Sequence, residues 1–361
     1  MSRKRLFVMA GGTGGHIFPG LAVAQQLQAR GWEVRWLGTA NRIEAWLVPQ
    51  YGIDISFIKV KSLHGENFLR LITVALVSIR AVIKALFYFR KWKPDVVLGM
   101  GGQASGPGGV AAWILGIPVV LHEQNAVAGL TNQWLSNIAT EVLQGFPGAF
   151  SSAPVVGNPV RFEVTQISKP EIRMSSNDRV ATRILVMGGS QGSGIINRVL
   201  PETIAQLGDG YEVIHQSGRG KLIETRMFYE NYCPQAAFHV YDFIDDVARA
   251  YAWSDLIICR SGALTVSEIS TVGIPAIFIP FIHEDRQQIL NAEHLVRRGA
   301  AVMIEQSVAT PSSLAKIIKK LDRSTLISMA GKARAASKNE ADRVIADAIE
   351  ETYRARLNHE N

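Results

Sequence analysis

The sequence predicts an α/β protein built from two Rossmann-like, doubly wound parallel-sheet domains. Short runs rich in Val, Ile and Leu alternate with helix-like segments along all 361 residues, a pattern typical of parallel sheets covered by helices on both faces. A glycine-rich loop also opens each half of the chain. Residues 11–20 (GGTGGHIFPG) follow the apolar run 5–10, and residues 188–192 (GGSQG) follow the run 183–187.

Twelve runs are predicted to be strands, six in each half. They are residues 6–10, 34–38, 53–60, 95–99, 119–122 and 141–144, then 184–187, 212–216, 237–241, 256–259, 276–280 and 301–304. The first domain is predicted to span residues 1–160 and the second 161–338, with the polar stretch 163–183 as the linker. Residues 339–357 read as a charged helix, and the segment 339–361 is expected to pack back on the first domain.

Composition limits the class of partner. The formal net charge of +7 and the pI near 9.4 favour an acidic partner such as a nucleotide or an anionic membrane. Nucleic acid is not expected, because no zinc-finger spacing or interleaved basic and aromatic pattern is present. Cys233 and Cys259 stand far apart without a CxxC motif, as expected of reduced thiols in a cytosolic protein. Neither a secretory signal nor a membrane-spanning stretch is predicted.

Each glycine-rich loop sits between a strand and a helix. Such a turn points backbone N–H groups and the positive helix end at one place, which favours a phosphate. Either loop alone could also be a simple entry into a helix. Neither is a Walker P-loop, and neither has the spacing of a dinucleotide fingerprint, so a nicotinamide enzyme is disfavoured. Residues 122–125 and 260–262 also follow strands, so we expect all these loops to line one cleft at the strands' carboxyl ends.

Residues 260–268 (RSGALTVSE) give the strongest local signal. A helix that starts at Ser-Gly can hold a diphosphate through the N–H groups of Ala263, Leu264 and Thr265. Glu268, one turn further, is placed to accept hydrogen bonds from a ribose diol, although it could equally be a carboxylate that favours the helix dipole. The amides of Gln287 and Gln288 suit a sugar because each donates and accepts; alternatively they form a solvated helix face.

These motifs, together with residues 99–109 (GMGGQASGPGG), 122–132 (HEQNAVAGLTN), 155–161 (VVGNPVR) and 280–288 (PFIHEDRQQ), resemble the MurG family. The resemblance runs through essentially the whole chain in the family's order. It implies an inverting GT-B glycosyltransferase that needs neither a metal nor a cofactor. The reaction it implies moves N-acetylglucosamine from UDP-N-acetylglucosamine to the C4 hydroxyl of N-acetylmuramic acid in lipid I. The product is lipid II for peptidoglycan, made at the cytoplasmic face of the bacterial inner membrane.

The resemblance also implies roles for individual residues. For the donor these are Arg161 and the Ile244 backbone at uracil, Ser190 and the amides of Ala263, Leu264 and Thr265 at the diphosphate, Glu268 at the ribose, and Gln287, Gln288 and Asn291 at the sugar, with Val266 and Ser267 in the same helix start. For the leaving diphosphate and the acceptor pyrophosphate they are Thr13, Gly14, Gly15 and His16, with Asn125 near the reacting sugar.

The acceptor hydroxyl must lose a proton, so the reaction requires a base. His16 and Glu123 are the candidates. Imidazole exchanges a proton near neutral pH, but His16 also fits an anion-binding role, and Glu123 fits a role in bracing its loop. The sequence leaves both open.

Residues 67–93 are predicted to form an amphipathic helix that touches an anionic membrane. One face carries Phe68, Leu71, Ile72, Leu76, Ile79, Val82, Ile83, Leu86 and Phe89, while Val74, Val77, Phe87 and Tyr88 fall outside that stripe, among Arg70, Arg80, Lys84 and Lys91. Apolar side chains ringed by cations are typical of an interfacial surface. We expect Ile72, Leu76, Ile79 and Val82 to take part, with Trp113 as a further anchor. Packing of the same stripe on the sheet is the alternative.

Two other classes of function share this architecture. One is a UDP-N-acetylglucosamine 2-epimerase or a glycolipid transferase with another acceptor. The other is a non-catalytic nucleotide-sugar sensor or scaffold. Contacts with other cell-wall synthesis or division proteins are a further expectation that the sequence does not specify.

Overall fold

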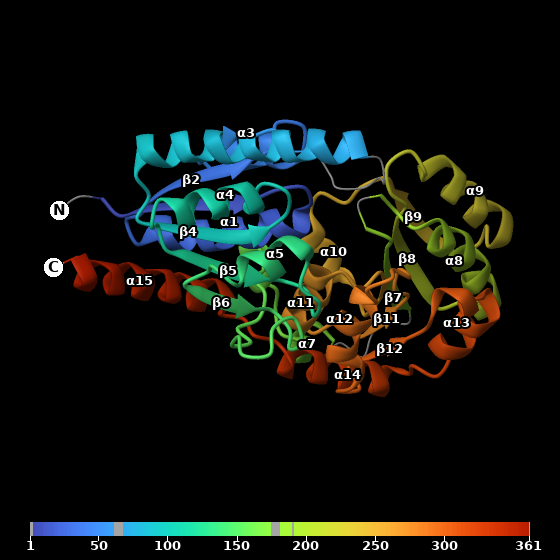
Figure 1. Ribbon diagram of the computed structural model, residues 1–361. Helices are drawn as coiled ribbons and strands as arrows, with labels where there is room; N and C mark the ends of the chain where they lie inside the picture. The colour runs from blue at the N-terminus through green and yellow to red at the C-terminus, as the bar shows by residue number, and fades with distance from the viewer. Residues whose placement is uncertain (1–2, 61–67, 175–180, 190, 361) are drawn as a thin grey trace. The chain divides into compact units, whose positions relative to one another are not determined.

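The computed structural model describes residues 3–60, 68–174, 181–189 and 191–360, with the side chains of residues 68–72 and 359–360 outside the described part. The chain forms two compact units. The first contains Met1–Arg161 together with Lys338–Asn361, and the second contains Phe162–Ser337. Each unit is a parallel sheet with helices packed on it (Figure 1).

The first unit holds a six-stranded parallel sheet in the order β3-β2-β1-β4-β5-β6. Its strands are β1 (Arg5–Ala10), β2 (Glu33–Gly38), β3 (Asp54–Phe57), β4 (Val96–Gly101), β5 (Val119–Glu123) and β6 (Glu141–Gln144). Its helices are α1 (Gly14–Ala29), α2 (Glu44–Gln50), α3 (Phe68–Trp92), α4 (Ser105–Ile114), α5 (Leu130–Leu135) and α15 (Ala341–Glu360).

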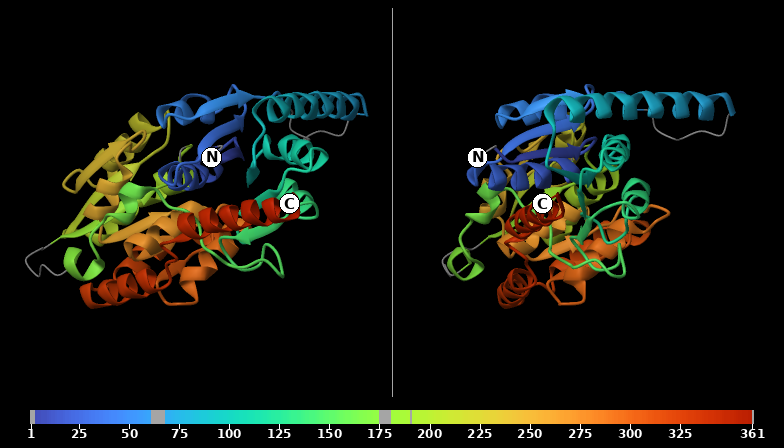
Figure 2. Two further views of the ribbon diagram at one scale, coloured as in Figure 1. Left: turned by 90° about the vertical axis from the view of Figure 1, so that its left-hand side faces the viewer. Right: turned by 60° about the vertical axis from the view of Figure 1, so that its left-hand side comes forward.

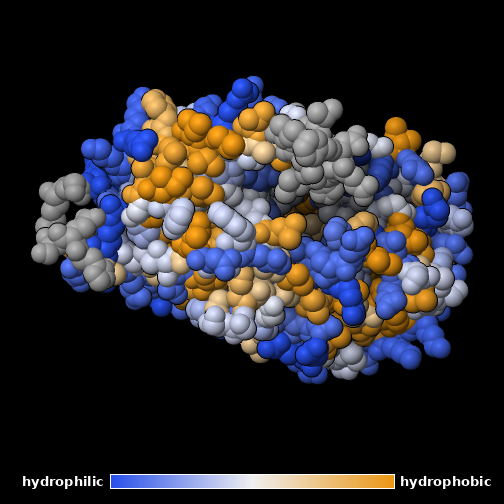
Figure 3. Space-filling view, in the orientation of Figure 1, coloured by the Kyte–Doolittle hydropathy of each residue, from blue (hydrophilic) through white to orange (hydrophobic). Residues whose placement is uncertain are grey.

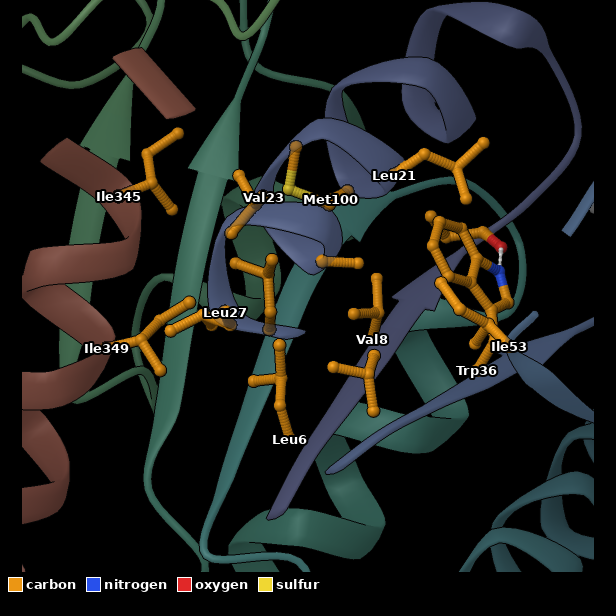
Figure 4. Close-up of a cluster of buried hydrophobic side chains, with 14 of the residues drawn as sticks. Leu6, Val8, Leu21, Val23, Leu27, Trp36, Ile53, Met100, Ile345 and Ile349 are labelled. Carbon is orange, nitrogen blue, oxygen red and sulfur yellow. Dashed lines mark hydrogen bonds between the residues drawn. The ribbon is translucent and has the colours of Figure 1, made fainter. Parts of the chain in front are cut away.

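Both faces of this sheet are buried, which explains why its strands are apolar throughout. Successive side chains of a strand point to opposite faces. Leu6 and Val8 of β1 therefore join a core with α1 and α15 (Figure 4), whereas Phe7 and Met9 join a second core with α3 and α4. The continuous apolar runs of the sequence arise from this double burial.

The second unit repeats the topology, with the strand order β12-β11-β10-β7-β8-β9. Its strands are β7 (Thr182–Met187), β8 (Tyr211–Gln216), β9 (Ala237–Tyr241), β10 (Leu256–Cys259), β11 (Ala276–Phe278) and β12 (Ala301–Met303). Its helices are α6 (Phe162–Thr165), α7 (Pro170–Arg173), α8 (Gly194–Leu207), α9 (Leu222–Tyr232), α10 (Val247–Trp253), α11 (Ala263–Val272), α12 (Gln287–Val296), α13 (Pro311–Ile318) and α14 (Arg323–Ala335), with a 3₁₀ turn at Gln306–Val308.

In both sheets the first strand lies in the middle, and the chain then builds outwards on either side of it. The order of strands reverses between β1 and β4 in the first unit and between β7 and β10 in the second. Loops leaving the carboxyl ends of such neighbouring strands diverge, which opens a crevice for a ligand. The predicted fold class and each of the twelve predicted strands are confirmed, with ends that differ by up to three residues.

The segment predicted as a linker packs on the second unit instead. It contains α6 and α7, and Pro170 at the start of α7 is buried. The Arg173 guanidinium donates hydrogen bonds to the carbonyl oxygens of Ser254 and Gly273, each at 2.9 Å. These contacts of Arg173 join the polar stretch to the second unit, and composition alone could not reveal them.

The C-terminal helix α15 belongs to the first unit, where it packs beside α1 (Figure 2). Ile345 and Ile349 complete the hydrophobic core around β1. Glu350 then pairs with Lys4 and Arg30 at 3.2 Å each. A central segment of α15 is therefore attached both by apolar burial and by ion pairs.

The structure corrects the predicted faces of α3. From residue 73 onwards, its buried side chains are Val74, Ala81, Ala85 and Phe89, although Val74 was predicted to lie outside the buried stripe. Leu76, Ile79 and Ile83, which were predicted to share the face of Phe89, are each more than half exposed. The small residues Ala81 and Ala85 allow close packing of α3 on α4 and the sheet, whereas the prediction counted only large apolar residues.

Candidate functional site

The first glycine-rich loop connects β1 to α1. Thr13 caps α1 with extended backbone, so the N–H groups of Gly14 and Gly15 are the first of the helix. Gly12 has φ +98°, a conformation that glycine adopts without strain. Thr13 is exposed, and Gly14, Gly15 and His16 are half-buried, so this helix start is accessible from solvent.

A buried acid that the sequence reasoning missed braces this loop. Glu44 is completely buried. One of its oxygens accepts from the Gly12 N–H at 3.2 Å, and the other accepts from the N–H and the hydroxyl of Thr39 at 3.0 and 2.7 Å. The available signal was a single acid within the apolar run 43–48 (IEAWLV).

The loop after β4 touches the first loop directly. Gly101 and Gly102 have φ of +94° and +79°. A Cβ on Gly102 would lie 2.0 Å from the carbonyl oxygen of Gly11, so the two backbones meet with no room for a side chain. Both loops therefore converge at the point where the strand order of the first sheet reverses.

The two candidate bases lie in different surroundings. His16 is half-buried, and its Nδ1 lies 2.8 Å from Oε1 of Gln124. Glu123 is buried, and its carboxylate accepts four hydrogen bonds: two from Asn125, one from the Gly129 N–H and one from Asn132, at 2.8 to 3.1 Å. Glu123 therefore holds its own loop, and Asn125 is positioned by that carboxylate.

In the second unit, the loop after β7 is tied to two neighbouring turns. Gly192 has φ +67°, and a Cβ there would lie 1.8 Å from the carbonyl oxygen of Ser217. Gln216 donates to the Gly189 carbonyl at 3.1 Å and accepts from the Ile244 N–H at 2.9 Å. The Gln216 amide thus links the glycine-rich loop to Ile244. Ser190, predicted to contact the diphosphate, lies outside the described residues.

The start of α11 is joined to the start of α12. Gly262 caps α11, and the Val266 N–H makes the first bond inside the helix, to the Gly262 carbonyl at 3.0 Å. Ala263, Leu264 and Thr265 therefore contribute the N–H groups at the helix end. The Ser261 hydroxyl donates to the Gln288 carbonyl at 2.7 Å, and the buried Asn291 amide donates to the Ser261 carbonyl at 3.3 Å.

Glu268 lies in the second turn of α11. Glu268 is buried, and one of its oxygens accepts from the Tyr251 hydroxyl at 2.9 Å. Ser267 beside it is also buried. Gln288, in the first turn of α12, accepts from the Phe281 N–H at 2.9 Å, and the Gln287 N–H donates to Asp285 at 3.0 Å.

Arg161 and Arg260 are two further cations with described contacts. Arg161 belongs to the first unit, where its guanidinium lies 4.8 Å from the centre of the Phe18 ring. The role of Arg260 was not defined by the sequence reasoning. It donates to the Ile279 carbonyl and to the Ser193 hydroxyl, each at 2.8 Å, and so fastens the end of β10 to the residue that caps α8.

Apolar side chains gather on the outer surface of α3 and α4 (Figure 3). Leu76, Ile79 and Ile83 are 53 to 59% exposed, and Phe87 and Trp113 are about 60% exposed. The exposed cations Arg80 and Lys84 lie among them on α3. Val82 is half-buried, and the side chain of Ile72 lies outside the described part. We call the five exposed residues Leu76, Ile79, Ile83, Phe87 and Trp113 the α3–α4 patch. Among the described residues, no helix has the length and apolar character needed to cross a membrane.

Two family models match successive parts of the chain, and the second ends within α15, which packs in the first unit. Residues 6–144 match the glycosyltransferase family 28 N-terminal domain, and residues 183–349 match the family 28 C-terminal domain. The UDP-N-acetylglucosamine--N-acetylmuramyl-(pentapeptide) pyrophosphoryl-undecaprenol N-acetylglucosamine transferase of Vibrio vulnificus is 60% identical over 96% of this chain and 97% of its own. The protein of that name from Vibrio parahaemolyticus is 61% identical over the same shares.

Solved structures are similar as well. The crystal structure of Acinetobacter baumannii MurG has a TM-score of 0.84 and 38% identity, covering 96% of this chain and 99% of that one. A putative UDP-N-acetylglucosamine 2-epimerase from Listeria monocytogenes has a TM-score of 0.70 at 15% identity, with 98% of each chain covered. At that identity the likeness is one of fold alone.

Proposed function

The chain belongs to glycosyltransferase family 28, and we propose that it transfers N-acetylglucosamine from UDP-N-acetylglucosamine to lipid I. Two close relatives are named as this transferase, and the chain aligns with nearly the full length of each. The acceptor atom is the C4 hydroxyl of N-acetylmuramic acid, and the product is lipid II, the precursor of peptidoglycan.

The observation that carries this proposal is the set of helix starts at the two points of strand-order reversal. The helices α1, α8 and α11, all of whose residues are described, have no acid in their first turn. Their dipoles and first N–H groups therefore face the adjacent loops without an acid of their own first turn to neutralise them. Donor and acceptor each contain a pyrophosphate, which is the chemistry that such helix ends bind.

The second unit supplies the donor site in this proposal. The N–H groups of Ala263, Leu264 and Thr265 bind the diphosphate, and the carboxylate of Glu268, oriented by Tyr251, accepts from the ribose hydroxyls. The Ile244 N–H is taken by Gln216, so the carbonyl of Ile244 is the group that we assign to uracil. Gln287, Gln288 and Asn291 bind the sugar from α12, whose start is held to that of α11 through Ser261.

Fixed N–H groups also assist the chemical step. Displacement at the anomeric carbon leaves negative charge on the departing UDP. Donors already held in place around that charge stabilise the transition state, because they need no reorganisation as the bond breaks. Glu44 and Gln216 contribute indirectly, since they hold the glycine loops of the two units in shape.

In the first unit we assign the base to His16. The carboxylate of Glu123 is buried and already accepts four hydrogen bonds, so its role in this proposal is to position Asn125 and the loop that follows. His16 lies in the first turn of α1 and is half-buried. A general base must reach the hydroxyl that it deprotonates, and of the two candidates His16 is the one at an accessible helix start.

We further propose that the α3–α4 patch docks on the cytoplasmic face of the inner membrane. An apolar surface with the cations Arg80 and Lys84 among its residues suits an anionic lipid interface, and an undecaprenyl acceptor is embedded there. The basic net charge of +7 supports the same partner. In this proposal the protein is peripheral to the membrane.

The decisive experiment incubates the protein with labelled UDP-N-acetylglucosamine, with and without a lipid I analogue. Transfer predicts release of UDP that depends on the acceptor, with the label in the lipid product. Interconversion of the sugar without acceptor would instead support an epimerase. Binding without turnover under either condition would contradict an enzyme and favour a sensor.

A further inference from the structure

A chain of hydrogen bonds runs from His16 into the interior of the first unit. His16 Nδ1 lies 2.8 Å from Gln124 Oε1, and Gln124 Nε2 lies 3.0 Å from His122 Nδ1. His122 Nε2 lies 2.9 Å from the carbonyl oxygen of Gly157. Both Gln124 and His122 are buried, so these contacts are made away from water.

Two backbone carbonyls determine where the hydrogens are. A carbonyl oxygen only accepts, so His122 must carry a hydrogen on Nε2 to bind Gly157. Burial lowers the pKa of His122 to about 4, which keeps the ring neutral near pH 7. Its Nδ1 therefore has no hydrogen and is an acceptor.

The orientation of the Gln124 amide follows in the same way. Its nitrogen lies 3.0 Å from the carbonyl oxygen of His122 as well as 3.0 Å from His122 Nδ1. Both partners are acceptors, so this end must be the NH₂ group, which has two hydrogens to donate. The oxygen of the amide then faces His16, and an amide oxygen can only accept.

We propose that Gln124 and His122 are positioning residues that hold neutral His16 in the tautomer with its hydrogen on Nδ1. The lone pair is then on Nε2, which becomes the atom that takes the proton of the acceptor hydroxyl. The partner of one ring nitrogen determines which nitrogen can act as the base. The role of Nε2 as the base rests on the proposed transfer reaction, whereas the tautomer of His16 is a property of the free protein.

The packing of the ring supports the same assignment. A Cβ on Gly101 would lie 3.1 Å from both Cε1 and Nδ1 of His16, so the Nδ1 edge of the ring faces the backbone of β4. Asn132 lies on the same side, since its amide nitrogen would be 3.3 Å from that Cβ. Glu123, the acid of this cluster, is bound to Asn132 at 2.8 Å. The ring edge that carries Nδ1 is thus turned inwards.

Nitrogen NMR of the full chain labelled with ¹⁵N-histidine tests the proposal, because ring nitrogens with and without hydrogen differ widely in chemical shift. The His16 signals are assigned as those lost in His16→Gln. At a pH where the ring is neutral, we expect His16 Nδ1 to be protonated and Nε2 to be bare. A ring that carries its hydrogen on Nε2 would overturn the proposal, whatever the protein's activity.

The variant Gln124→Met keeps the length of the side chain and removes its hydrogen bonds to His16 and His122. We expect His16 to populate both tautomers and kcat to fall about two- to fivefold through the smaller competent fraction, with KM for UDP-N-acetylglucosamine unchanged. Gln144→Met is the matched control, because Gln144 is equally buried at the end of β6 and its amide binds Phe150 and Ala153. The control should lose stability and keep the tautomer.

The two proposals fail in different ways. Absence of transfer in the wild-type protein would remove the proposed function and leave the tautomer measurement valid. A wild-type protein that transfers N-acetylglucosamine, together with a Gln124→Met variant that retains the Nδ1–H tautomer, would refute the positioning role alone. If Gln124→Met does not fold, the wild-type spectrum still decides which nitrogen carries the hydrogen.

Discussion

Gly15→Ala is the sharpest test of ligand approach to the first loop, because the folded protein has room for the new methyl group. A Cβ on Gly15 would meet only the hydroxyl of Thr13, at 3.4 Å, which is an ordinary contact. Alanine is also the better helix former by up to about 1 kcal/mol. We therefore expect the free energy of unfolding to be unchanged or higher. For a unit of this size, each kcal/mol of added stability raises the melting temperature by about 2–4 °C.

The effect on transfer should be the opposite. An oxygen bound to an N–H group lies about 2.9 Å from the nitrogen, whereas a methyl carbon needs about 3.5–4 Å from a neighbouring atom. If a pyrophosphate sits against the start of α1, transfer to a lipid I analogue should fall at least tenfold, which is about 1.4 kcal/mol. UDP affinity, measured by calorimetry, should be unchanged because the proposed donor site lies in the second unit.

Gly331→Ala is the control for helix propensity. Gly331 lies within α14, a Cβ there has open space, and α14 carries none of the proposed site residues. The stability of the Gly331→Ala protein should rise in the same way, while its rate of transfer should equal that of the wild type. A Gly15→Ala protein with wild-type transfer would refute close approach of the ligand to this loop.

Three further predictions concern the donor site, the membrane and pH. Glu268→Ala should weaken UDP binding at least tenfold by calorimetry, since a hydrogen bond to a charged group contributes about 1.5–3 kcal/mol; unchanged affinity would remove Glu268 from the site. Replacing Leu76 and Ile79 by Ser should lower binding to anionic liposomes without lowering the melting temperature, because both side chains are more than half exposed; intact liposome binding would exclude them from the interface. Burial lowers the pKa of His215 to about 3, whereas an unfolded histidine titrates near 6.5, so its contribution to stability is complete above about pH 6.5 and is lost as the pH falls from there towards 3. Below about pH 6.5 the loss approaches about 1.4 kcal/mol per pH unit, so urea unfolding at pH 7 and pH 5 should differ by about 2 kcal/mol from this group, and a His215→Gln protein with the same pH dependence would contradict it.

The fold could be predicted from the sequence because both faces of each sheet are buried. Continuous apolar runs such as Leu6 to Ala10 then identify strands without any alternation, and the glycine loops show where a strand passes into a helix. The helices' contact faces were harder to predict. In α3, apolar residues occur on most sides, and the face that packs was decided by Ala81 and Ala85, whose small side chains carry little weight in a hydrophobic pattern.

The candidate site shows the same difference between local and distant information. The motif around Gly262 specifies a helix start locally, so the N–H groups of α11 could be proposed from spacing alone. The second candidate base could not be assessed in this way, because the partners of Glu123 include Asn132, nine residues further on. Glu44 was missed because its partner Gly12 is 32 residues away, and no local pattern connects a helix acid to a distant turn.

The return of α15 to the first unit has a consequence during synthesis on the ribosome. About 180 residues separate Arg161 from the start of this helix at Ala341. At 5–20 residues per second, a nascent first unit waits roughly 10–40 s for its last helix. Through that interval the apolar surface of β1 and α1 that Ile345 and Ile349 later cover faces solvent or a chaperone, so the first half of the chain completes its fold only after the second half has been made.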